Sequence, residues 1–136
     1  QPFPNSSKSE GVVTPIRDAL SNRFKPETDS RMILRLKGGS RVWINLAAGR
    51  LSIGDIDLNG DKEKELKKVL RVLRWICWLS GIFHIQTHLS PCCTLDRVFR
   101  DLGYVPRTTI PICHLDISSV LPIDKVHYTY GDFDTF

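Results

Sequence analysis

The longest regular pattern of apolar positions lies between Asn59 and Gly81 and predicts a helix. Apolar residues recur there every three or four positions, which is the period of one helical face. They are Leu66, Val69, Leu70, Leu73, Ile76 and Cys77. Four more apolar residues widen that face: Val72, Trp75, Trp78 and Leu79. We therefore expect a helix over about 61–80, capped by Asn59 or Asp61 and ended by Gly81, with its second half buried nearly all round.

A short strand and a second helix are predicted next. Residues 82–89 are β-branched and aromatic over a length typical of a buried strand. Ser90 and Pro91 suit the N-cap and first position of a helix. Apolar residues at helical spacing then precede Gly103: Leu95, Val98, Phe99 and Leu102. We expect Phe99 and Leu102 in the core and Gly103 in a left-handed conformation that ends this helix.

Three strands are predicted upstream of the long helix, over residues 32–36, 41–47 and 51–58. Turns at 37–40 and 48–50 would connect them. Gly54 indicates either a β-bulge or a close backbone approach within the third strand. The fold class that follows is α/β, with a mixed, mostly antiparallel sheet and helices on its faces.

The two ends of the chain are less regular. We expect a flexible arm over 1–14 and a single domain over 15–136, with a short helix at 15–24 and a strand at 125–130. Pro111 should lie at a strand edge or bulge. The aromatic and acidic tail, 128–136, would pack on its own domain or add to a partner as a strand.

Composition narrows the class of protein. A chain of 136 residues that is 41% hydrophobic and 25% charged can fold as one domain with a real core. Its net charge of +4 does not by itself indicate nucleic-acid binding. Four cysteines without framework-like spacing favour a reducing cytoplasm, and the absence of an apolar run near 20 residues argues against a membrane span. The chain begins at Gln1 rather than Met, so we expect a processed or truncated product.

One motif resembles a known family. Phe99–Tyr104 reads Phe-Arg-Asp-Leu-Gly-Tyr, which is similar to the aromatic-x-x-Leu-Gly-aromatic ending of the fourth helix in the GNAT superfamily of N-acetyltransferases. The predicted order of elements from about Arg31 to Phe136 resembles that fold too. The resemblance implies acetyl-CoA as cofactor and direct attack of an amine on the thioester. A backbone amide near residues 54–56 would polarise the thioester carbonyl.

The resemblance also implies which residues would meet the acyl-CoA. They are Ile56, Leu58, Gly60, Lys62, Lys64 and Lys67. The chain departs from the family at the pyrophosphate loop, where only Gly60 remains and Asp61, Glu63 and Glu65 would repel phosphate. It also has Phe99 where the family often has a tyrosine that protonates the leaving thiolate. Two functions stay open: an acyl-CoA-dependent N-acetyltransferase, or a non-catalytic binding or structural module within a larger assembly.

Cysteine, histidine and acidic residues offer a candidate nucleophile and candidate metal ligands. Cys92, at the first turn of the second helix, could act as a nucleophile with His88 as its base, although a buried structural role is commoner for cysteine. His84 and His88 would stand about 13 Å apart in a strand, too far to share a zinc ion. Residues 55–61 imitate the start of a calcium loop, but the twelfth position is Leu66 instead of a glutamate. We expect no metal site.

A basic stripe lies opposite the apolar face of the long helix. Its members are Lys64, Lys67, Lys68, Arg71 and Arg74. Such a stripe can contact the phosphates of a nucleic acid or of CoA, or it can be a solvated face stabilised by pairs such as Glu63 with Lys67.

Overall fold

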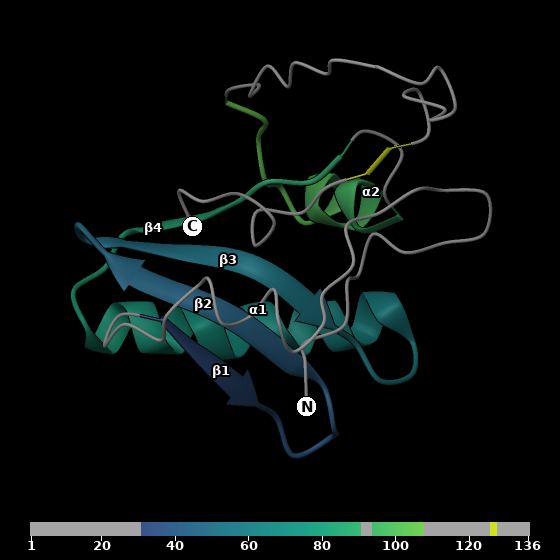
Figure 1. Ribbon diagram of the computed structural model, residues 1–136, viewed down its shortest axis with the longest axis horizontal. Helices are drawn as coiled ribbons and strands as arrows, with labels where there is room; N and C mark the ends of the chain where they lie inside the picture. Colours follow the sequence, from purple (N-terminus) through teal and green to yellow (C-terminus); the bar gives the residue numbers. More distant parts are fainter. Residues whose placement is uncertain (1–30, 91–93, 108–125, 128–136) are drawn as a thin grey trace, which may run out of the picture.

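The computed structural model describes residues 31–90, 94–107 and 126–127 (Figure 1). The elements, in chain order, are β1 (Arg31–Arg35), β2 (Arg41–Ala47), β3 (Arg50–Asp57), α1 (Lys62–Leu79), β4 (His84–Thr87) and α2 (Thr94–Asp101). The predictions for the arm, the helix at 15–24, Pro111 and the tail at 128–136 lie outside the described residues. Of the strand predicted at 125–130, only Val126 and His127 are described, and Val126 forms a single β-bridge.

The sheet has the strand order β1-β2-β3-β4. The first three strands pair antiparallel, and β4 pairs parallel to β3. Helix α1 makes the crossover between these two parallel strands and runs along one face of the sheet, while α2 lies beyond the β4 edge (Figure 1). The predicted fold class, an α/β domain with a mixed and mostly antiparallel sheet, is therefore confirmed.

Local sequence explains the tight joints. Ala48 and Gly49 both have positive φ, 52° and 70°, which is the backbone of the two-residue hairpin turn that matches strand twist. Each helix ends at a glycine with positive φ, Gly81 after α1 and Gly103 after α2. Beyond Gly103 the Tyr104 amide donates to the Phe99 carbonyl over 3.0 Å, so the end of α2 is a Schellman motif. The predicted left-handed conformation of Gly103 is confirmed.

A bulge interrupts β3 at Gly54. Asp55 stands opposite Trp43 and Ile53 opposite Ile44, so Gly54 is the extra residue on its strand. Beside the bulge, β3 stops pairing with β4: the last register pair is Ile53 with Thr87, although β3 continues to Asp57. The two parallel strands thus separate at the bulge. Of the two alternatives predicted for Gly54, a β-bulge or a close backbone approach, the structure has the β-bulge.

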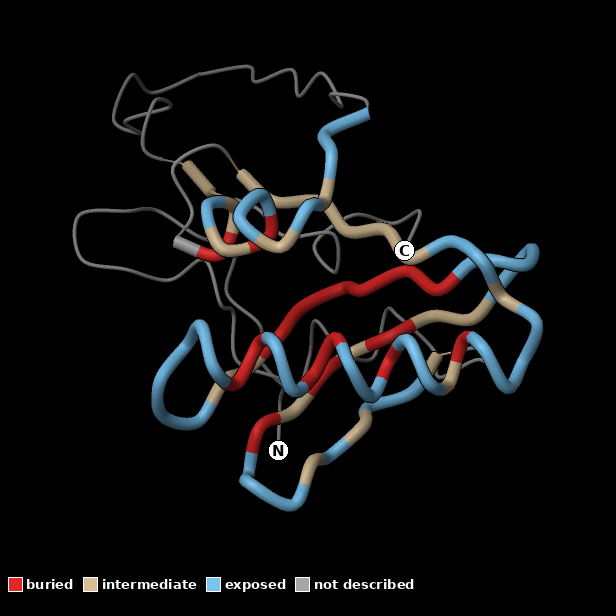
Figure 2. Tube along the Cα trace, turned by 180° about the vertical axis from the view of Figure 1, so that it is seen from behind, coloured by how far each residue is buried: buried red, intermediate tan, exposed pale blue. Residues whose placement is uncertain are grey.

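The core lies between the sheet and α1, with α2 completing it (Figure 2). Its fully or nearly fully buried members are Val42, Ile44, Leu51, Ile53, Ile56, Leu66, Val69, Leu70, Leu73, Cys77, Leu95 and Phe99. A buried side chain of this size contributes about 1.5–3 kcal/mol relative to an exposed one. Phe99 is in the core as predicted, whereas Leu102 is only partly buried and packs against it.

The prediction that α1 is buried nearly all round in its second half is wrong. Val72, Trp75, Trp78 and Leu79 expose 40%, 59%, 69% and 75% of their surfaces. The reason is geometric: α1 touches the sheet only along the stripe from Leu66 to Cys77, and no other described element covers its outer side (Figure 2). The strand predicted at 82–89 is also shorter, since only His84–Thr87 pair with β3, and it is half-buried.

Candidate functional site

The start of α1 is closed by its own cap. The Asp61 carboxylate accepts a hydrogen bond from the Lys64 amide over 3.1 Å, as the sequence predicted for a capping residue. This hydrogen bond, with the Lys64 ammonium nearby, holds the pKa of Asp61 below its ordinary 3.8. Asp61 is therefore a negative charge at neutral pH, placed where the helix dipole and a free amide would otherwise attract an anion.

The next turn of α1 pairs its acids with its lysines. Glu63 accepts from Lys67 and Glu65 accepts from Lys68. The first pair is the predicted i,i+4 interaction. Both lysines are thus directed toward carboxylates of their own helix, which offset part of the positive charge at the start of α1.

A polar cluster fastens the start of α1 to the β1–β2 turn. The Ser40 hydroxyl donates to the Glu65 carboxylate over 3.0 Å and accepts from the Asn59 amide over 3.1 Å. The Asn59 side chain donates to the Gly38 carbonyl. Hydrogen bonds from Lys68 and then Ser40 lower the pKa of Glu65. The loop at residues 59–61 is therefore held in one position by neighbouring residues.

A backbone amide beside the bulge in β3 is hydrogen-bonded to a side chain of the same strand. The Ile56 amide donates to the carboxylate of Asp55 over 2.7 Å, and Asp55 is only 3% exposed. Before the residue where β3 and β4 separate, the Thr87 hydroxyl donates to the Ile53 carbonyl, and the side-chain amide of Gln86 donates to the Ser52 hydroxyl. These bonds fix β4 against β3 up to the residue where the strands separate.

The residues predicted to meet an acyl-CoA are close in sequence but different in setting. Ile56 is in the core, Leu58 packs partly against it, and Gly60 is exposed with φ 98°. Lys62, Lys64 and Lys67 are exposed on the first turns of α1. The structure brings Gly60, Lys62 and Lys64 together at one turn, because they are neighbours, but places Asp61 and its carboxylate between them.

Of the predicted nucleophile and its base, only the base, His88, lies within the described residues. His88 is half-buried just after β4, and burial lowers its pKa, so its imidazole is neutral at neutral pH. Cys92 lies outside the described residues. Phe99, at the position of the family's tyrosine acid, is 4% exposed and stacks edge-on against Tyr104 with ring centres 5.2 Å apart. It is a core residue.

The oxygens of the calcium-like stretch have other partners. Asp55 accepts from Ile56, Asp57 forms an ion pair with Arg41 at 2.7 Å, and Asp61 accepts from Lys64. Within the described residues, no group of three or more His, Cys, Asp or Glu side chains could hold a metal ion. No helix of this part is long and apolar enough to cross a membrane.

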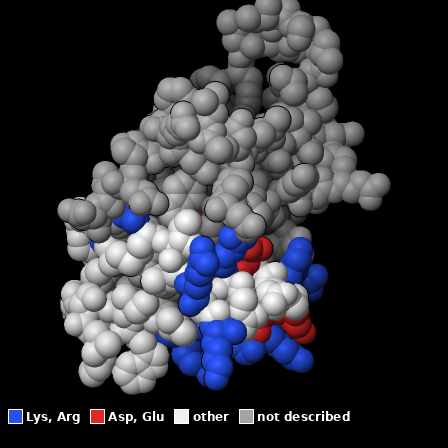
Figure 3. Space-filling model, turned by 60° about the horizontal axis from the view of Figure 1, so that its bottom comes forward, with Lys and Arg blue, Asp and Glu red and all other residues white. Residues whose placement is uncertain are grey.

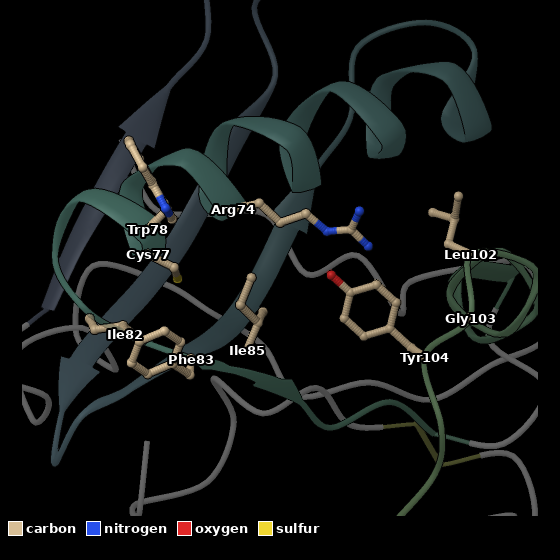
Figure 4. Close-up of a pocket in the computed structure, with 9 residues that line it drawn as sticks. All are labelled: Arg74, Cys77, Trp78, Ile82, Phe83, Ile85, Leu102, Gly103 and Tyr104. Atoms are coloured by element: carbon tan, nitrogen blue, oxygen red, sulfur yellow. The ribbon is translucent and has the colours of Figure 1, made fainter.

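The opposite end of α1 carries a second feature, an open trough of about 430 Å³ between α1, β4 and the end of α2 (Figure 4). Cys77, Ile82 and Ile85 line it, with Trp78 and Phe83 at one end and Arg74 over the Tyr104 ring at the other. Sequence analysis missed this feature because it assigned the apolar residues here to the core. The sequence does contain a feature that indicates such a surface, because the apolar stripe of α1 is wider than packing on one sheet requires.

The basic stripe is exposed along α1. α1 contains six Lys or Arg and two Glu, a balance of +4 that equals the net charge of the whole chain. Seen from below, the described surface shows Lys and Arg side chains gathered with Asp and Glu among them (Figure 3). Lys64, Lys67 and Lys68 each lie beside a carboxylate of residues 61–65, whereas Arg71 has no ion pair with a described residue.

No family model, curated protein or solved structure matches this chain. The features that bear on its function are therefore those of its own geometry. They are the separation of the parallel strands β3 and β4, the start of α1 capped by the Asp61 carboxylate, and an apolar trough with Arg74 at one end.

Proposed function

We propose that this chain is a domain built like a GNAT acyltransferase that serves as a non-catalytic binding module. Three features support the likeness: an antiparallel meander followed by a parallel strand, a helix that crosses between the two parallel strands, and their parting at a bulge. The Phe99–Tyr104 motif ends the following helix, as it does in that family.

The hydrogen bond from the Lys64 amide to Asp61 carries the argument against catalysis. An acyl-CoA enzyme of this kind needs open amides at the start of α1 for the pyrophosphate. Here Asp61 accepts from the first-turn amide, and its charge faces the approaching phosphate. The exposed Asp61 carboxylate and a phosphate carry like charges, so their repulsion opposes the attraction that the helix terminus exerts on an anion.

The second donor that catalysis would need is also engaged. In the resemblance, an amide near residues 54–56 polarises the thioester carbonyl. The Ile56 amide, one of the three amides in this range, instead donates to the buried carboxylate of Asp55. Phe99, at the position where the resemblance implies a proton donor, has no proton to give, which also supports a non-catalytic role.

The second candidate is an acyl-CoA-dependent N-acetyltransferase. It is favoured by the bulge at Gly54 and by the separation of β3 from β4 beyond Ile53, since such an opening could admit an extended cofactor. In that case Lys62, Lys64 and Lys67 would have to hold the phosphates. Contact with nucleic acid through the stripe has less support, because its first three lysines are beside carboxylates.

Titration calorimetry with acetyl-CoA distinguishes the two. The module predicts a dissociation constant no tighter than about 1 mM, or roughly −4 kcal/mol. Micromolar affinity that is weakened by Lys62→Ala or Lys64→Ala would restore the enzyme. Arg97→Ala, which removes an exposed cation from α2, is the matched control. We place the module in the cytoplasm, on the grounds of its cysteine usage.

A further inference from the structure

The C-terminal end of α1 and the connection to β4 expose a group of large apolar side chains, which we call the tryptophan patch. It consists of Trp75, Trp78, Leu79 and Phe83, which expose 59%, 69%, 75% and 86% of their surfaces. The two indoles stack edge to face, with ring centres 5.6 Å apart. Large apolar side chains grouped in this way on a domain surface mark an interaction site more often than they mark a packing accident.

The patch adjoins the trough, which supplies depth. Trp78 and Phe83 belong to both, and the floor is formed by Cys77, Ile82 and Ile85 (Figure 4). Cys77 is 5% exposed and its thiol pKa is raised by burial, so the floor is apolar and uncharged at neutral pH. A concave apolar floor flanked by protruding aromatics can accept inserted aliphatic or aromatic side chains.

Cations border this apolar surface. Arg71 lies four residues before Trp75 on α1, and Arg74 lies four residues before Trp78, so both arginines are on the same side of the helix as the exposed indoles. Arg74 also lies 6.0 Å from the centre of the Tyr104 ring at the end of the trough. No acidic residue occurs in α1 after Glu65. The border is therefore positive on the α1 side.

We propose that the tryptophan patch and the trough are the docking site for an acidic amphipathic segment of a partner protein. Its apolar side chains would insert between Trp78, Phe83 and the floor, and its carboxylates would pair with Arg71 and Arg74. Tryptophan and arginine are the residues that most often dominate such interfaces. The proposal extends the proposed function by giving the module a partner, but it concerns the far end of α1, so the acetyl-CoA titration does not bear on it.

Charge and shape favour this occupant over others. A second copy would bring two α1 helices of charge +4 together, which repels. A single-stranded nucleic acid needs flat, open ring faces for its bases, whereas these indoles meet edge to face and the floor is aliphatic. A lipid surface would be met by protruding side chains alone and would leave the concave floor unfilled.

Selection from a phage-displayed library of random dodecapeptides against the immobilised full chain tests the proposal. The expected result is enrichment of sequences that combine Leu, Phe or Trp with Asp or Glu. Affinity for a labelled enriched peptide should fall at least about tenfold in Phe83→Ser and in Trp78→Ser, and it should fall severalfold in Arg71→Ala. All three side chains are exposed, so the variants should melt like the parent protein.

Each control substitution removes the same kind of exposed side chain, apolar or cationic, from a part of the domain outside the tryptophan patch and the trough. Ile33→Ser removes an exposed apolar residue from β1, and Arg97→Ala removes an exposed cation from α2; both should leave peptide binding unchanged. The proposal is overturned if no peptide enriches, if enriched peptides are basic, or if Phe83→Ser has no effect on them. It is also overturned if the same substitutions instead abolish binding to polyuridine or to vesicles of phosphatidylserine and phosphatidylcholine.

Discussion

Asp61 shows how one carboxylate decides what the start of a helix can bind. As a cap it stabilises α1, and as a charge it excludes anions from the same amide. The family that the chain resembles uses glycine-rich sequence there, which leaves the amides open. In this chain the Asp61 carboxylate takes up the Lys64 amide from within the same segment.

The cost of replacing Gly103 should come from its backbone conformation and not from a steric clash. Its φ is +84°, and a Cβ added there would meet no atom within 4 Å. Gly103→Ala should therefore lower the free energy of unfolding by about 1 kcal/mol or more, through backbone strain alone. Gly38→Ala is the control, since φ there is not positive and the new methyl would sit in ordinary contact. Equal denaturation midpoints for Gly103→Ala and the parent would contradict this reading.

Glu65 should make stability depend on pH in the acid range. Its pKa is below the ordinary 4.5 because Lys68 and Ser40 donate hydrogen bonds to the ionised carboxylate. A group with a lowered pKa stabilises the fold above its unfolded value, and that contribution is lost as pH falls through the folded value. We expect Glu65→Gln to be less stable than the parent at neutral pH and to lose less stability below pH 4.5.

Denaturant melts of both proteins across that pH range measure the difference. Glu63→Gln, whose pair with Lys67 is exposed, serves as the control and should change stability little at neutral pH. Parallel pH profiles for Glu65→Gln and the parent would show that the cluster with Ser40 does not act through the charge of Glu65.

At the scale of elements, α1 has two apolar regions with different jobs. One stripe, from Leu66 to Cys77, packs on the sheet, while Trp75, Trp78 and Leu79 are exposed on the outer side. The sequence predicted the existence, boundaries and caps of α1 well, because these depend on spacing and on capping chemistry. It did not separate core from interface, because both surfaces use the same residues and periodicity alone cannot say which side meets a partner.

A pair of substitutions on α1 measures this division. Leu73 is 1% exposed, so Leu73→Ala should cost about 2–5 kcal/mol of unfolding free energy. Trp75→Ala removes a larger side chain that is 59% exposed, and it should change stability by no more than about 0.5 kcal/mol. A loss of several kcal/mol for Trp75→Ala, measured in guanidinium, would mean that the outer face of α1 is packed.

The candidate site could be predicted only in part. The single glycine of the loop, Gly60, and the presence of Phe99 were visible in the sequence, and so was the choice between bulge and close approach at Gly54. The hydrogen bond between the Ile56 amide and Asp55 was not predictable, because it depends on how the bulge turns a buried carboxylate back on its own strand. The trough was not predictable either, since it combines α1, β4 and the end of α2.

At the scale of the molecule, the two ends of α1 have opposite character. Its start is closed by Asp61 and by the cluster of Ser40, Asn59 and Glu65, while its end is open, aromatic and bordered by arginines. This polarity is what a binding module would need. Hydrogen bonds hold its start against the β1–β2 turn, and in the proposed module its exposed end would present side chains to a partner.

The central claim is that the amides of Lys64 and Ile56 are held by the chain's own carboxylates and do not receive a cofactor. Amide chemical shifts in a two-dimensional ¹H–¹⁵N NMR titration with acetyl-CoA test it residue by residue. The account predicts that the Lys64 and Ile56 resonances stay in place at submillimolar acetyl-CoA. Saturable shifts of both amides in that range would contradict it, because they would place the pyrophosphate and the thioester where the carboxylates of Asp61 and Asp55 now lie.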